Sequence, residues 1–170
     1  TEPTKDSPFY KAPFSFAQKG TVKAIAYDAT FQKSSPVSSK IFDIPPHSYT
    51  VVFPKEESTS RMFDGNGYTA CYLPKGKQEL IIRLDKEYAI RGFLYTPNQQ
   101  RDAGGHISNY QLFIDNKKVA EGEFSNIKAN PIEQEVYFPV VKGQQVKLVV
   151  TRIVDNQKQA GIGEFSLITE

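Results

Sequence analysis

One short loop of the chain brings together several side chains that carry oxygen atoms. Asp64, Asn66 and Thr69 fall within six positions, around Gly65 and Gly67. Carboxylate, amide and hydroxyl oxygens, completed by backbone carbonyls, are ligands that Ca²⁺ accepts. The same spacing is typical of an Asx turn, in which such side chains bond to their own backbone. On spacing alone the turn is the simpler interpretation, and the Ca²⁺ site stays its alternative.

A second polar stretch, residues 95–107, lies between two expected strands. It contains several amides together with Arg101 and His106. These groups donate or accept hydrogen bonds in fixed directions, which suits a ligand rich in hydroxyl groups, and a nearby Tyr ring could cover the apolar face of a sugar. Long loops inside compact β domains often have a function. The alternative is a solvated loop without a ligand.

The chain offers little for catalysis. Cys71 stands between apolar residues and is expected to be a small core residue rather than a nucleophile. One Cys allows no internal disulfide, and with only two His it cannot build a zinc site. No glycine motif that cradles a phosphate is present. We therefore expect a protein that is not an enzyme.

Composition excludes further classes of function. The 21 Lys and Arg nearly balance the 19 Asp and Glu, giving a net charge of +2. A dedicated nucleic-acid binder would show a clustered basic footprint instead. No apolar run is long enough for insertion into a membrane, and no signal segment opens the chain. We expect either a cytosolic protein or a fragment whose leader lies elsewhere.

Alternating apolar and polar residues predict strands throughout. The pattern occurs at 79–85, 109–115, 134–138, 146–151 and 165–167, and no amphipathic helical stretch competes with it. Turn-forming pairs separate these runs, at Asp64–Gly67, Lys75–Gly76, Asp115–Asn116, Glu121–Gly122, Lys142–Gly143 and Asp155–Asn156. Short strands joined by polar turns are typical of an antiparallel sandwich. The expected fold class is therefore all-β.

Two consecutive prolines mark a boundary. Pro45 and Pro46 remove two backbone donors and stiffen the chain, which suits a linker over residues 45–48. Residues 1–44 contain a strand-like stretch at 21–27 but are too few for an independent core. This segment either packs on the larger domain, 49–170, or is part of a module that lacks a strand.

Six segments of the larger domain resemble, in the same order, those of coagulation factor 5/8 type C (discoidin-like) domains. The segments are 63–66, 79–85, 90–97, 105–114, 119–124 and 163–168. This resemblance implies a jelly-roll β-sandwich of the galactose-binding-domain-like kind, a fold that includes many carbohydrate-binding modules. It implies a sugar site formed by loops at one end of the jelly roll.

The resemblance also implies which residues form the sites. A structural Ca²⁺ would be held by Asp64, Asn66, Thr69 and Glu164. The sugar-binding residues would be Tyr72, Asn98, Arg101 and His106. Two departures from the family pattern are expected to weaken, alter or abolish sugar binding. Ala70 or Cys71 replaces a usual Trp, and the late loop 155–160 lacks a stacking aromatic, so stacking must come from Tyr72 or Tyr68.

The first residues are similar to a different family. Glu2–Thr4, 21–27 and 35–38 resemble the Ig-like module at the C-terminus of chitobiase/β-hexosaminidase-type proteins. In that family a further strand precedes these segments, so we expect an incomplete first module. The combination of modules resembles the C-terminal part of bacterial glycoside hydrolases that are secreted, periplasmic or on the cell surface. The catalytic domain would lie upstream in the same chain.

The leading hypothesis is a non-catalytic carbohydrate-binding module that tethers its parent enzyme to an oligo- or polysaccharide. It predicts an exposed Tyr beside Asn98, Arg101 and His106. The alternative is a structural spacer or interaction module without sugar binding, which predicts that these side chains are buried or scattered. A lipid-binding role needs apolar loop tips, which 157–159 do not offer, and an enzyme ranks last.

Overall fold

A computed structural model describes residues 1–14, 19–43 and 48–170. The chain divides into two compact units, Thr1–Pro45 and Pro46–Glu170. The expected linker at 45–48 lies outside the described residues except for Ser48. Among the described residues, no helix combines the length and apolar character needed to cross a bilayer.

The smaller unit contains one antiparallel pair of strands. β1 (Gly20–Ala24) pairs with β2 (Ser38–Phe42) from Gly20 opposite Phe42 to Ala24 opposite Ser38. The expected strand at 21–27 therefore ends early, and Tyr27 continues only as an isolated bridge to Ser34. Phe31 stacks on Tyr27 with ring centroids 5.9 Å apart. Most side chains of this unit are exposed because so short a segment encloses little volume.

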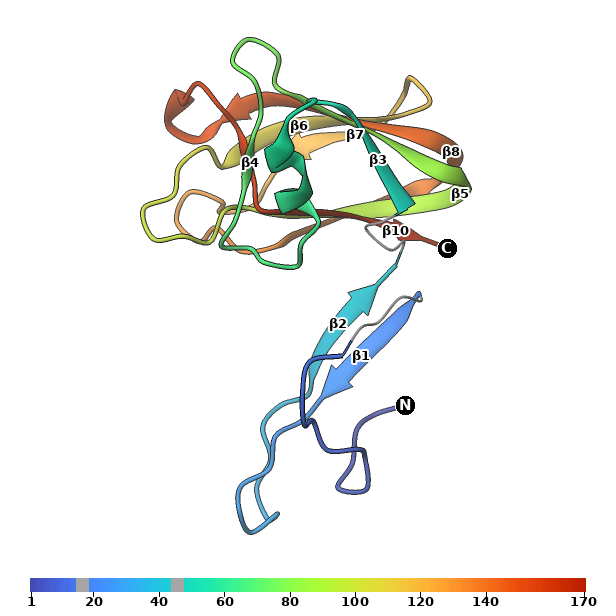
Figure 1. Cartoon of the computed structure of the whole chain (residues 1–170), viewed down its shortest axis with the longest axis vertical. Coiled ribbons are helices and arrows are strands. Elements are labelled where there is room, and N and C mark those ends of the chain that lie inside the picture. Colours follow the sequence, from blue (N-terminus) through green and yellow to red (C-terminus); the bar gives the residue numbers. More distant parts are fainter. Residues whose placement is uncertain (15–18, 44–47) are drawn as a thin grey trace. The chain divides into compact units, whose positions relative to one another are not determined.

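The larger unit is an antiparallel β-sandwich. Its elements are β3 (Tyr49–Phe53), the 3₁₀ helix η2 (Glu57–Met62), β4 (Cys71–Tyr72), β5 (Glu79–Thr96), β6 (Ile107–Ile114), β7 (Lys117–Glu123), β8 (Gln134–Ile153), the 3₁₀ turn η3 (Val154–Asn156), β9 (Gly161–Ile162) and β10 (Glu164–Thr169). The order of the main sheet is β10-β5-β8-β6-β7, with β3 also on β5, and β4 pairs with β9. Figure 1 shows the long β5 and β8 side by side. The all-β expectation is confirmed.

The core follows the alternation in the sequence. Leu80, Ile82 and Leu84 of β5 are buried, as are the corresponding apolar residues of β6 and β8. Phe93 lies at the centre of an aromatic cluster and packs edge-on against Tyr110 at 5.3 Å. Fully burying one such side chain contributes about 1.5–3 kcal/mol. The packed core gives the loops at the ends of the strands a rigid support.

Two expected turns are wrong, because their glycines lie inside strands. Gly122 belongs to β7 and Gly143 to β8. A Cβ on Gly143 would lie 2.2 Å from a methyl group of Ile114, and one on Gly122 would lie 3.2 Å from the Tyr110 hydroxyl. A side chain at 143 would therefore displace Ile114, whereas one at 122 would be in tight contact with Tyr110. In the sequence, a glycine that forms a turn looks the same as a glycine inside a strand that lets a neighbouring side chain approach closely.

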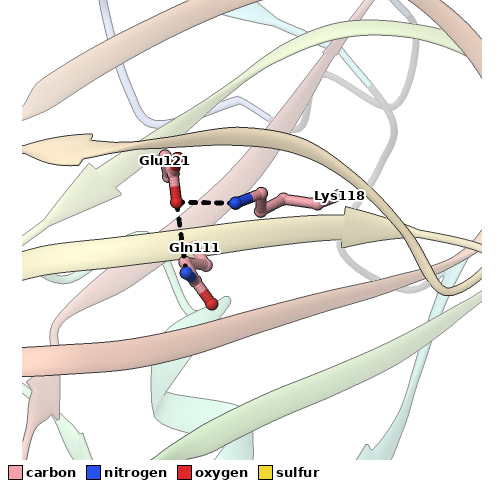
Figure 2. A network of polar contacts seen from close by, with 3 residues as sticks. All are labelled: Gln111, Lys118 and Glu121. Carbon is pink, nitrogen blue, oxygen red and sulfur yellow. Dashed lines mark hydrogen bonds and ion pairs between the residues drawn. The ribbon is translucent and has the colours of Figure 1, made fainter.

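The outer face of β6 and β7 is polar. Gln111 and Glu121 stand opposite each other, and Gln111 Nε2 donates to Glu121 Oε2 at 3.1 Å. Lys118 Nζ lies 2.8 Å from the same oxygen (Figure 2). Hydrogen bonding by Lys118, then by Gln111, lowers the Glu121 pKa. The carboxylate of Glu121 thus already has two partners within the protein.

Candidate functional site

Tyr72 is held against glycine backbone at one end of the sandwich. β4 pairs with β9, so that Tyr72 lies opposite Gly161. A Cβ on Gly161 would lie 2.9 Å from Tyr72 Cε1, and one on Gly105 would lie 3.2 Å from the same atom. The ring therefore rests directly on these two residues because they lack side chains. It remains 38% exposed and can serve as a platform for a ligand.

Asn98 fixes the position of this ring. Its Nδ2 donates to Tyr72 Oη at 3.3 Å, and Tyr72 Oη in turn lies 3.5 Å from the carbonyl oxygen of Gly104. Asn98 Oδ1 accepts the N–H of Gln100 at 3.0 Å. Asn98 is only 4% exposed, so its amide mainly supports Tyr72 and the loop after β5.

His106 lies half-buried in the loop before β6. Burial lowers its pKa, while a hydrogen bond to the backbone of Asn98 acts in the opposite direction. The net lowering keeps the imidazole largely neutral at pH 7. Among the described residues no group bonds to Nε2, which is enclosed. His106 thus has an unused polar atom in the same loop cluster as Asn98.

Arg101 is exposed in the turn next to this cluster. The N–H of Ala103 donates to the Gln100 carbonyl at 3.1 Å, and Asp102 adopts a left-handed φ of 63°. The structure therefore brings Tyr72 and Asn98 into contact and bonds the His106 side chain to the Asn98 backbone. Arg101 lies on the adjoining turn, without a contact that places its guanidinium on Tyr72.

Three glutamines that the sequence analysis missed hold the late loop in place. Gln157 Oε1 accepts the N–H of Gly105, and Gln159 Nε2 donates to the Leu73 carbonyl at 3.1 Å. Gln78 Oε1 accepts the N–H of Ala160 at 2.7 Å. The amides at 157 and 159 were visible in the sequence, but their partners are far away along the chain.

The Asp64 loop forms the expected Asx turn. Asp64 Oδ1 accepts the N–H of Asn66 at 2.8 Å, and Asn66 Oδ1 accepts the N–H of Tyr68 at 3.1 Å. Thr69 Oγ1 donates to Asp64 Oδ2 at 2.8 Å. The loop is therefore ordered by its own hydrogen bonds, which leave the carboxylate and amide oxygens of the turn close together.

Glu164, at the start of β10, lies against this turn. Burial, and then a hydrogen bond shared with Asp64, raise the Glu164 pKa to about 7. Burial also acts to raise the pKa of Asp64, but hydrogen bonds from Thr69 and Asn66 hold it below its usual value. Glu164 Oε1 is enclosed and has no hydrogen-bond partner among the described residues.

The side chains at this turn offer only oxygen ligands, which do not suit a soft metal ion. Within the described ranges no three His, Cys, Asp or Glu side chains cluster as they would around a metal. Asp64 and Glu164 supply two carboxyl groups, while Asn66 and Thr69 supply neutral oxygens. Such a set fits only a hard cation that also accepts backbone carbonyls, as Ca²⁺ does. The four residues expected to hold Ca²⁺ therefore lie together, and the ion itself stays a prediction.

Cys71 is fully buried beside Tyr72, as expected for a core residue. Burial raises the pKa of its thiol, although a hydrogen bond from Ser58 acts against this. A buried thiol with a raised pKa is a poor nucleophile. Tyr95, behind the site, donates to the Gly161 carbonyl at 3.1 Å and supports β9 from the core.

Two of three comparisons with known proteins found a match, one with a family model and one with solved structures. Residues 1–42 match the family model described as Fn3 associated. Among curated proteins, none is significantly similar in sequence to the chain. Solved structures of carbohydrate-binding modules match instead, among them three at sequence identities of 17–23%.

Three of these structures illustrate the similarity. CBM32-3 from a family 31 glycoside hydrolase of Clostridium perfringens is 17% identical, with a TM-score of 0.63 over 75% of this chain and 94% of that one. The family 32 module of C. perfringens NanJ, in complex with galactose, is 23% identical, with a TM-score of 0.60 over 72% and 95%. The C-terminal domain of a Bacteroides fragilis chitobiase is 18% identical, with a TM-score of 0.60 over 75% and 97%.

These folds are those of binding modules rather than catalytic domains. They agree with the antiparallel pairing of the strands in the larger unit. The chain has the discoidin-like β-sandwich fold of the family 32 carbohydrate-binding modules, as its sequence predicted.

Proposed function

We propose that the larger unit binds a glycan without cleaving it, at the loop end centred on Tyr72. The observation that supports this most is the way in which Tyr72 is held. Its ring packs on Gly105 and Gly161, and its hydroxyl accepts a hydrogen bond from Asn98. Part of the ring still faces solvent. An aromatic ring fixed in this way is organised before the ligand arrives. Sugar rings have an apolar C–H face that can pack on it.

Polar groups around the ring would select among sugars. His106 Nε2 is an enclosed polar atom without a partner among the described residues, and Arg101 is an exposed cation on the adjoining turn. Arg101, and His106 once ligand binding uncovers its Nε2, would bond hydroxyl groups of the ligand, whereas Asn98 would act through Tyr72. One aromatic ring and a few hydrogen bonds give modest affinity, in the high-micromolar to millimolar range, or about −4 to −6 kcal/mol.

A structural Ca²⁺ at the Asp64 turn belongs to the same proposal. Asp64, Asn66, Thr69 and Glu164 would hold the ion. The unpartnered Glu164 oxygen and the carboxyl pair support this, because a divalent cation would offset the burial and the nearby Asp64 carboxylate that otherwise favour a proton on Glu164. The ion would brace the loop that precedes Tyr72 and would take no part in chemistry.

The structural neighbours support a proposal for the protein in which the module works. CBM32-5 of a C. perfringens family 89 enzyme was solved in complex with GalNAc-β-1,3-galactose, and other neighbours come from a family 31 glycoside hydrolase and a chitobiase. We infer that this chain belongs to a secreted, periplasmic or cell-surface bacterial glycoside hydrolase. Its partners would be a glycan and a catalytic domain upstream in the same protein.

A spacer module without sugar binding is the second candidate. The burial of Asn98 and the half-burial of His106 favour it, since a spacer needs these side chains only for support. The exposed ring of Tyr72 favours binding, because a purely structural Tyr would gain more stability by being buried. The two candidates therefore differ in what removing this ring would do.

A glycan array, with and without Ca²⁺, followed by titration of the best ligand, tests the proposal. Tyr72→Ala should abolish saturable binding. Tyr137→Ala is the matched control, because Tyr137 is 53% exposed on β8 and is itself none of the proposed sugar contacts. Folded protein that binds no glycan would support the spacer instead, whereas equal glycan binding by both variants would place the binding site away from Tyr72.

A further inference from the structure

A second hollow lies beside the proposed sugar site, between the chain after β7 and the end of β8. Its volume is about 270 Å³. That is just below the roughly 300 Å³ at which sites for small molecules usually begin, so it has room for one sugar ring. Figure 1 shows the segments after β5, after β7 and after β8 at the same end of the larger unit. We call this hollow the β7–β8 groove.

The groove has a rigid floor. Phe124 and Ile127 are buried beneath it, at 3% and 4% exposure. Phe124 stacks on Tyr110 with ring centroids 4.5 Å apart, and its N–H donates to the Ser108 carbonyl at 2.8 Å. An ion pair of 2.6 Å between Lys128 and Asp155 joins one wall to the other. The groove is therefore a formed feature and not a gap between mobile loops.

Its polar lining includes residues of the strands on either side of β6. Asn109 of β6 stands opposite Glu123 of β7 on one side and opposite Arg152 of β8 on the other. The register is irregular on both sides of the Asn109–Arg152 pair, so the groove lining rather than the ladder places the two side chains. Glu123 and Arg152 lie on the two strands that pair with β6, and their side chains line the groove as an acceptor and a donor.

Neither of these two charges is used within the protein. Glu121, two residues earlier, is bonded by Lys118 and Gln111 (Figure 2). By contrast, no ion pair or side-chain hydrogen bond in the described ranges engages Glu123 or Arg152. Both side chains line the groove and are exposed. They are therefore available to a ligand.

The groove shares a wall with the Tyr72 site. The N–H of Val154, in the groove, donates to the His106 carbonyl at 2.9 Å. Gln157, three residues further on, bonds the N–H of Gly105, on which the Tyr72 ring rests. Both places are thus bonded to the same short segment, Gly105–His106, one through Val154 and the other through Gln157.

We propose that the β7–β8 groove is a second subsite, which takes one uncharged sugar unit of a glycan whose neighbouring unit lies on Tyr72. This inference rests on the proposed function. Two negative side chains, Glu123 and Asp155, and two positive ones, Lys128 and Arg152, line the groove, so its net charge is zero. Paired acceptors and donors without net charge suit hydroxyl or acetamido groups better than a carboxylate or a sulfate.

The test is a titration of the ¹⁵N-labelled chain with GalNAc-β-1,3-galactose, N,N′-diacetylchitobiose and lactose, with galactose and N-acetylglucosamine as single units. Amide signals of Gly104 and Gly105 report on the Tyr72 site, and those of Ser108, Asn126 and Lys128 report on the groove. A disaccharide that binds should shift both sets, whereas a single unit should shift mainly the first. Arg152→Gln should weaken the disaccharide roughly tenfold and leave the single unit unchanged.

Lys142→Gln is the control, because it removes the same charge from an exposed position of β8 away from the groove. Shifts at Gly104 and Gly105 alone would overturn the subsite and leave the proposed function intact. A sialylated form of lactose that fills the groove more tightly than lactose would overturn the uncharged ligand class. No shift with any of these sugars, from folded protein, would overturn the proposed function and the subsite together.

Discussion

Glu164 shares a hydrogen bond with Asp64, although the two residues are a hundred positions apart. The contact joins the first residue of β10 to the turn that precedes β4. Burial and this bond raise the Glu164 pKa to about 7, whereas the Asp64 pKa is lowered. The pair therefore holds a proton between pH 4.5 and 7 that two separate carboxylates would have lost.

The first prediction concerns stability against pH without Ca²⁺. In the unfolded chain Glu164 loses its proton near its usual pKa of 4.5, but in the folded chain it keeps it until about pH 7. The folded state thus binds more protons in this range, and the free energy of unfolding falls as pH rises from 4.5 to 7, by about 1–2 kcal/mol once solvent screening of this half-buried group is taken into account. Urea unfolding in the presence of a chelator measures this.

The variant Glu164→Gln isolates this effect. His106 acts in the opposite direction, because its lowered pKa means that the unfolded state binds more protons just below pH 6.5. Asp64 acts only at lower pH, where its stabilising charge is lost as the pH falls through its lowered pKa. The free energy of unfolding is measured against pH for the unmodified protein and for Glu164→Gln. Subtracting one curve from the other removes the contributions of His106 and Asp64. An unchanged slope in the variant would contradict the shifted pKa of Glu164.

The second prediction is that Ca²⁺ stabilises the larger unit. An ion that binds only the folded state adds about 2.7 kcal/mol to the free energy of unfolding at a hundred times its dissociation constant. The gain should be largest at pH 7 and above, where the ion no longer competes with a proton on Glu164. Calorimetric titration and thermal unfolding measure the effect.

Asp64→Asn and Glu164→Gln should each remove most of the Ca²⁺ effect, because each takes away one of two negative ligands. Asp102→Asn is the control, since it removes a carboxylate from an exposed turn. If the unmodified protein in millimolar Ca²⁺ shows neither binding heat nor a change in unfolding temperature, the Asx turn alone explains the geometry of Asp64, Asn66 and Thr69.

The sequence predicted the strands well because burial follows the alternation of side chains. Leu80, Ile82 and Leu84 point inward as expected, and the Asp115–Asn116 turn joins β6 to β7. The glycines were harder to interpret. Gly143 looks like a turn residue, and only the position of Ile114 in space shows that it serves close packing.

The candidate site was predictable only in part. Tyr72 and Asn98 were named from a family resemblance, and the structure adds that Asn98 is buried and supports the ring. Gln157 was not among the predicted site residues, because its partner, Gly105, lies 52 positions away in the sequence. The only feature of the loop 155–160 that entered the prediction was its lack of an aromatic residue. Long-range contacts between a side-chain amide and the backbone leave no periodic pattern in a sequence.

The third prediction compares two glycines with the same backbone conformation. Gly105 has φ +82° and Gly76 has φ +84°, but a Cβ would lie 2.6 Å from the Gln159 carbonyl at Gly105 and would meet nothing at Gly76. Gly76→Ala should cost about 1–2 kcal/mol through backbone strain alone. Gly105→Ala should cost more and should also weaken glycan binding, since it displaces the Tyr72 ring. Equal losses of stability in urea unfolding would show that the close contacts at Gly105 are unimportant.

The fourth prediction concerns Gln157, whose side chain accepts the N–H of Gly105 and packs against Gly104. Gln157→Ala leaves that N–H to water and frees the loop on which the Tyr72 ring rests. We expect affinity for the glycan to fall severalfold, at a cost of about 1 kcal/mol, while the unfolding temperature changes little because Gln157 is exposed. Lys158→Ala, at the next exposed position, should leave affinity unchanged. Loss of binding in both variants would mean that the late loop contacts the ligand directly, whereas loss in neither would mean that the packed core alone holds Tyr72 in place.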